Sequence, residues 1–154
     1  MTATALAALL LLATPPPSPT TLAAPFSRDF ELLVVSDSIW GHCDLSVTAT
    51  GPTQAELVNA CRDYDGPVRR TARKLLPAEI GTLRALLRQA DLFSKVSEGT
   101  DHRGIDLPLI TLKVTADGRS AEMVCFMNPD FQRDGPRKRL LDQLLTWFRE
   151  TRKG

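Results

Sequence analysis

Two segments on either side of Asp117-Gly118 constrain the fold of this chain more than any other feature. Residues 110–115 alternate apolar and polar side chains, and the segment after the turn supplies matching partners. Asp-Gly favours a two-residue hairpin turn because both residues tolerate positive φ angles. Folding back at this turn pairs positions whose numbers add to 235, which places Ile110, Leu112 and Val114 opposite Cys125, Met123 and Ala121. Lys113 meets Glu122 on the other face, so both faces predict the same antiparallel register.

A second hairpin is predicted around Gly51-Pro52-Thr53. Residues 43–50 are apolar at odd positions and polar at even ones, which is typical of a half-buried strand. Pairing them with residues 55–61 in a register whose numbers add to 104 places Cys43 opposite Cys61 on the apolar face. This geometry favours a disulfide between them. Two buried thiols, or pairing of either one with Cys125, are the alternatives; Cys125 itself is expected in the core.

The remaining segments complete an α+β pattern. Residues 30–35 and 68–75 are rich enough in β-formers to predict strands, with a loop from Ser36 to Gly41. Pro77 opens an amphipathic helix, and a second helix runs from Pro136 to about Arg152. We therefore expect an antiparallel sheet of about six strands, in the order β-β-β-β-α-β-β-α, with two helices packed on one face. The predicted single domain covers residues 30–152, preceded by a short leader at 25–29.

The N-terminus has the composition of an export signal. Residues Ala5 to Ala13 form an apolar run that is too short to cross a bilayer, which needs about 20 residues. Small residues follow, so a signal peptide over residues 1–24 with cleavage near Ala24 is expected. The sequence departs from the usual pattern because its first basic residue is Arg28. A disordered leader or a retained anchor are the alternatives to an exported protein, periplasmic or secreted.

The charge balance narrows the class of partner. The chain has 19 Lys and Arg residues against 18 Asp and Glu residues, a net charge of +1. Nucleic-acid binders usually carry a clear basic excess, so nucleic acid is not an expected partner. Another protein or an envelope component is expected instead. No cofactor is expected, and no transmembrane span is predicted after signal removal.

The histidines are the only candidates for metal chemistry. A metal site wants three or four ligands at motif spacing, and Asp101, His102 and Asp106 form only a thin cluster. A solvated loop is the favoured interpretation. A metal-dependent protein using His42, His102 and Asp106 is kept as an alternative. No residue is assigned a catalytic role, since no nucleophile has a base at a recognisable spacing.

Two loops are candidate binding surfaces. One contains Ile39 and Trp40 with His42 beside them, and the other runs from Asp101 to Asp106. An exposed Trp next to a Gly-containing loop can anchor an interface, whereas a buried Trp would serve the core. The expected function is thus that of an exported, non-catalytic domain that binds a macromolecule.

A basic cluster lies on the fourth expected strand. Arg69, Arg70, Arg73 and Lys74 are expected to lie largely on the outer face of the sheet, where they could bind an acidic surface or lipid headgroups. A solvated face, or an edge strand protected from pairing by its charge, is the alternative. Arg137, Lys138 and Arg139 lie in the first turn of the last helix, where positive charge opposes the helix dipole and suggests a local anionic partner or nearby acidic side chains.

Two resemblances attach to these motifs. The segment Trp40-Gly41-His42-Cys43 and the segment Asp106-Leu107-Pro108 resemble the motifs of an uncharacterised family of exported bacterial domains. That likeness implies an exported α+β domain and supplies no catalytic residues. Ile39 stands where the family has a second Cys. Leu76-Pro77-Ala78-Glu79 and the element order resemble the emfourin-type metalloprotease inhibitors, which implies an inhibitor as an alternative; their Gly-rich loop after the first strand is absent here.

Overall fold

A computed structural model of the chain describes residues 25–38, 41–94, 109–125 and 128–150. These residues form a six-stranded antiparallel sheet and three helices, which is the predicted α+β fold. The strands are β1 Phe30–Ser38, β2 Gly41–Thr50, β3 Gln54–Asp63, β4 Arg69–Lys74, β5 Leu109–Ala116 and β6 Arg119–Val124. The helices are α1 Pro77–Ala90, α2 Pro129–Gln132 and α3 Pro136–Glu150.

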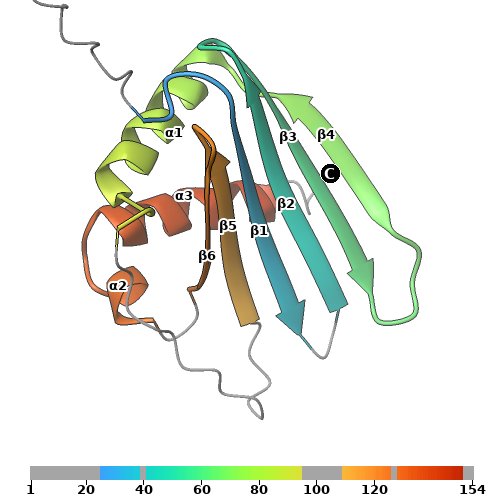
Figure 1. Cartoon of the computed structure of the whole chain (residues 1–154). Helices are drawn as coiled ribbons and strands as arrows, with labels where there is room; N and C mark the ends of the chain where they lie inside the picture. The colour runs from blue at the N-terminus through green and yellow to red at the C-terminus, as the bar shows by residue number, and fades with distance from the viewer. Residues whose placement is uncertain (1–24, 39–40, 95–108, 126–127, 151–154) are drawn as a thin grey trace, which may run out of the picture.

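The strands lie in the order β4-β3-β2-β1-β5-β6, so β1 occupies the centre between the two hairpins (Figure 1). Both predicted registers are confirmed. Cys43 pairs with Cys61 across β2 and β3, and Val114 pairs with Ala121 across β5 and β6. In each hairpin, a shift of the register by one residue would move all apolar side chains of one strand to the solvent-exposed face. The alternation of apolar and polar residues was therefore enough to determine the register.

The core lies between one face of the sheet and the long helices. Figure 1 shows α3 passing behind the strands, on the side away from the viewer. Alternate strand residues such as Leu32, Leu45 and Leu112 are fully buried there. The helices meet them with Leu83 of α1 and Leu144 of α3, which are equally buried. Each such side chain contributes about 1.5–3 kcal/mol by leaving water.

The domain begins earlier than the sequence suggested. Phe26 lies in the segment expected to be a leader, yet its side chain is only 2% exposed and stacks on Phe93 at 5.6 Å between ring centroids. Arg84 of α1 holds this segment by donating to the backbone carbonyls of Phe26 and Arg28. Its guanidinium also donates to the carbonyl of Gly51 in the β2–β3 turn. We name residues 25–29 the N-terminal strap.

Two boundaries differ from the prediction for local reasons. The expected loop from Ser36 to Gly41 is shorter, because β1 continues to Ser38 and pairs there with Gly41. The expected loop before α3 contains the short helix α2, which Asn128 caps by accepting from the backbone N–H of Asp130. Both were missed because Ser36, Asp37 and Ser38 are residue types common in turns and a four-residue helix leaves no periodicity.

Candidate functional site

The second face of the sheet is a surface that no described helix covers (Figure 1). We call it the open face; it carries the even-numbered side chains of β2, β3, β4 and β6 and the odd-numbered ones of β1 and β5, as the registers require. Half-buried Leu33 and Val35 on β1 and Val58 on β3 lie near its centre. Hydroxyl and charged side chains surround them, among them Ser46, Thr48, Thr115, Glu31, Glu56, Lys74 and Lys113.

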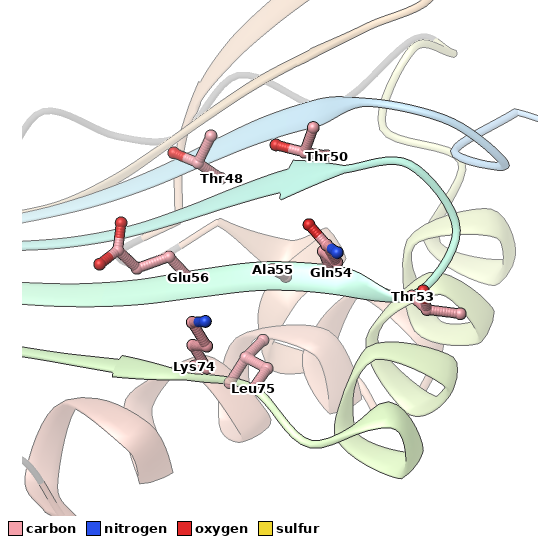
Figure 2. A pocket seen from close by; sticks show the side chains of 8 residues that line it. All are labelled: Thr48, Thr50, Thr53, Gln54, Ala55, Glu56, Lys74 and Leu75. Carbon is pink, nitrogen blue, oxygen red and sulfur yellow. The ribbon is translucent and has the colours of Figure 1, made fainter.

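A hollow of about 330 Å³ lies at one corner of the open face, over β2, β3 and β4. Figure 2 shows the side chains of Thr48, Thr50, Gln54, Glu56 and Lys74 around it. All five residues are exposed, so the hollow leaves a ligand largely in water. Small-molecule sites of this size normally bury most of their ligand among apolar groups. The hollow therefore suits part of a macromolecular surface better than an isolated small molecule.

The basic residues of β4 do not form one patch, which corrects the expectation that they share a face. Arg69 and Arg73 pair with Cys61 and Leu57 and so point to the helix side, whereas Arg70 and Lys74 lie on the open face. Their separation follows from the period of two along a strand.

The two arginines on the helix side are already paired. Arg69 contacts Asp63 at 2.6 Å, and Arg73 binds both carboxylate oxygens of Glu79 at 2.8 and 2.9 Å. The hydrogen bonds with Glu79 raise the pKa of Arg73, and those with Arg73 lower the pKa of Glu79. Within the part of the chain that the structure describes, Arg70 and Lys74 have no ion-pair partner. Of the four basic side chains of β4, these two therefore carry the charge that is available to a ligand.

His42 lies at the far end of the open face between two carboxylates. Its Nδ1 is 2.5 Å from Asp37 Oδ1, and its Nε2 is 2.9 Å from Asp44 Oδ1. The hydrogen bond to Asp37 is the main cause that raises the pKa of His42 above its ordinary value. With both ring nitrogens engaged, the imidazole is held by its neighbours. Among the described residues no group of three or more His, Cys, Asp or Glu is arranged to hold a metal ion.

Several predicted site residues fall outside the described residues. Ile39 and Trp40 lie in the first gap, and Asp101, His102 and Asp106 lie in the gap at 95–108. The structure therefore brings His42 together with Asp37 and Asp44, and it leaves the proposed grouping with His102 and Asp106 as a prediction.

The cysteines divide into a pair and a single thiol. The sulfur atoms of Cys43 and Cys61 are 2.16 Å apart, within disulfide distance, and the residues are directly opposed in the β2–β3 register. Cys125 is buried, and burial raises the pKa of its thiol to about 12. At neutral pH it is a core residue and not a thiolate nucleophile. No helix within the described ranges has the length and apolar character needed to cross a membrane.

Sequence reasoning missed two polar side chains, Asp37 and Arg84, and left the acidic partner of Arg137 without a residue number. Asp37 was assigned to a loop, although folding β1 back on β2 brings it opposite His42. Arg84 was passed over, although it lies four residues after Ile80 and three before Leu87, on the margin of an apolar helix face. The acidic neighbour expected for Arg137 is Asp130, at 2.9 Å. Arg137 also donates to the carbonyl of Ala90, where a positive charge favours the end of α1.

The described parts of the motifs behind the two resemblances have structural roles, whereas Trp40 and Asp106 to Pro108 lie outside the described residues. Gly41 has a φ of +154°, and a Cβ there would lie 2.5 Å from the carbonyl oxygen of Arg62, so only glycine fits between β1 and β3. Pro77 occupies the first turn of α1, and Glu79 accepts from the backbone N–H of Leu76 at 2.7 Å, which stabilises the helix start. No protein-family model matches the sequence, and no curated protein matches it either.

Proposed function

We propose that this chain is an exported, non-catalytic module that binds another protein of the envelope or the extracellular space through the open face. The observation that carries the proposal is the composition of that face. Half-buried Leu33, Val35 and Val58 lie at its centre, with charged and hydroxyl side chains around them. An apolar centre with a polar rim is the usual composition of a protein interface.

The chemistry of the described residues supports binding over catalysis. The thiol of Cys125 is buried with a pKa near 12, and both nitrogens of His42 face carboxylates. The hollow beside Thr48 is too exposed to exclude water from a reacting group. A binding role needs none of these groups to react.

Export is supported by two independent features. Cys43 and Cys61 are at bonding distance, and a structural disulfide persists in oxidising compartments. The apolar run from Ala5 to Ala13 has the length of a signal core. Fractionation of cells expressing the tagged chain tests this part: Leu10→Arg should retain the protein inside the cell, and unchanged export of that variant would contradict it.

Crosslinking of the purified protein to an envelope extract tests the binding part. Thr48→Arg places a long charged side chain on the open face, whereas Thr82→Arg makes the same change at an exposed position of α1. We expect a specific crosslinked protein with the wild type and with Thr82→Arg, and its loss with Thr48→Arg. Equal crosslinking by both variants, or none by the wild type, would overturn the proposal.

A further inference from the structure

The outer edge of β4 carries backbone groups that no described strand satisfies. β4 ends the sheet on one side, and Figure 1 shows no element beside it. The backbone N–H of Leu75 donates to Ala55 on β3 at 2.9 Å, so the odd residues of this segment face β3. Because the direction alternates along an antiparallel strand, the N–H and C=O groups of Arg70, Ala72 and Lys74 point outward. The carbonyl of Lys74 also accepts from Arg73 Nη1 at 3.5 Å, so that one group is already engaged within the chain.

The side chains along this edge have a defined order. Arg70, Ala72 and Lys74 lie on the open face, in positions separated by two residues. Val68 and Leu76 continue the same spacing at either end, with exposures of 61% and 65%. Together with Tyr64 they are the large hydrophobic residues that remain exposed in the described chain. The edge therefore presents an apolar, basic, small, basic, apolar sequence beside three sets of outward backbone groups.

A second copy of this chain is a poor occupant of the edge. Antiparallel pairing of two β4 strands that uses all three outward residues sets Ala72 opposite Ala72 and Arg70 opposite Lys74. Like charges directly opposite each other destabilise a sheet. Arg69 and Arg73 cannot relieve this repulsion, since they add further positive charge and are bound to Asp63 and Glu79.

We propose that β4 binds an extended acidic segment of a partner protein as an additional antiparallel strand. This inference rests on the proposed binding function and names its partner chemistry. Main-chain hydrogen bonds to Arg70, Ala72 and Lys74 supply the affinity, and side-chain contacts supply the selectivity. The segment carries acidic residues four positions apart, opposite Lys74 and Arg70, and apolar residues opposite Leu76 and Val68.

Charge on an edge strand also discourages unwanted pairing. Protection of the β4 edge and recognition of an acidic segment are compatible roles. Basic side chains repel a basic strand, whereas they attract an acidic one. Exposed Val68 and Leu76 do not protect an edge; they offer apolar contact to whatever pairs with it. The combination favours selective pairing over plain protection.

A short peptide tests the proposal directly. The probe is the acetylated, amidated and fluorescently labelled peptide Val-Thr-Glu-Thr-Val-Thr-Glu-Thr-Val, and its control has Gln in place of both Glu residues. Fluorescence anisotropy should show saturable binding of the acidic peptide to the full chain, at least about tenfold tighter than the control and weakened by salt. No binding of the acidic peptide at millimolar protein, or equal binding of both peptides, would overturn the proposal.

Two variants separate backbone pairing from charge attraction. Ala72→Pro removes an outward N–H while leaving the β3 ladder intact, and Ala72→Thr keeps that N–H. We expect about tenfold weaker binding for Ala72→Pro and no change for Ala72→Thr; equal binding by these two variants would refute strand addition. Arg70→Glu with Lys74→Glu should abolish binding of the acidic peptide, which tests the charge attraction. If Ala72→Pro fails to fold, N-methylation of the central Val of the peptide removes a hydrogen bond of the same ladder from the partner's side; it should weaken binding about tenfold, and unchanged binding would refute strand addition.

These experiments distinguish a failure of strand addition at β4 from a failure of the proposed binding function of the open face. Crosslinking that depends on Thr48 but not on Ala72, without binding of the acidic peptide, would refute strand addition and leave the open face as the interface. Loss of the crosslinked protein in both Thr48→Arg and Ala72→Pro would show that the β4 edge and the open face contact the same partner as one binding surface.

Discussion

Removal of the Cys43–Cys61 link is the sharpest test of the fold. We consider Cys43→Ala with Cys61→Ala, both made in a Cys125→Ala background so that no thiol remains to exchange. The two cysteines are separated by 18 positions. In the chain-entropy model a loop of that size restricts the unfolded state by roughly 11 cal/mol/K, which is about 3 kcal/mol at room temperature. The variant should lose about that much free energy of unfolding.

Urea unfolding followed by tryptophan fluorescence measures this loss, because Trp147 is buried in the core and becomes exposed on unfolding. With a urea dependence of about 2 kcal/mol/M, the midpoint should fall by roughly 1.5 M. The slope should rise as well, since the unlinked unfolded chain exposes more surface.

Reduction supplies the matched control. The Cys125→Ala protein, treated with a reducing agent, should unfold at nearly the same urea concentration as the double alanine variant, because both lack the covalent link. A midpoint that neither reduction nor substitution moves would show that no link forms between Cys43 and Cys61. A fall on substitution without a fall on reduction would assign the loss to side-chain packing, since both cysteines are buried.

The other predictions concern single residues. Gly41→Ala should lower the free energy of unfolding by about 1–3 kcal/mol, because its φ of +154° disfavours any side chain and Arg62 blocks the Cβ; a loss below about 0.5 kcal/mol in chemical denaturation would contradict this. Arg84→Met should cost about 3 kcal/mol, since it leaves buried carbonyls of the strap without donors, and unchanged thermal unfolding would refute that role. The raised pKa of His42 means that its pairing with Asp37 stabilises the fold fully below pH 6.5 and is lost as pH rises through the folded pKa. The stability difference between wild type and His42→Gln should therefore shrink above pH 6.5, and a difference that is constant or grows with pH would contradict the assignment.

Local alternation predicted much of the fold because it encodes two things at once, the strand and its register. The hairpin at Asp117-Gly118 and the opposition of Cys43 and Cys61 both followed from it. The position of β1 between β2 and β5 did not, because alternation shows which face is buried and not which distant strand lies alongside. The extension of β1 to Ser38 was hidden because Ser36, Asp37 and Ser38 are residue types common in turns.

The candidate site was harder to predict than the fold. The separation of Arg69 and Arg73 from Arg70 and Lys74 could have been read from strand parity alone. The hollow could not, because Thr48, Gln54 and Lys74 come together only through the pairing of three strands. Of the two carboxylates around His42, Asp44 could have been predicted, because it lies two residues later on the same strand face. Asp37 could not, because its position depends on the β1–β2 register.

The N-terminal strap imposes an order of events on the maturation proposed for this chain. Phe26 is anchored in the core by Arg84 and by its backbone N–H, which donates to Asp117 Oδ2. A protease that cuts near Ala24 must hold the neighbouring residues in an accessible, extended form. Docking of Phe26 would withdraw them from it. The proposed processing near Ala24 should therefore be fastest before the strap docks, and a protein that folds first should be cut slowly, at a rate set by release of Phe26.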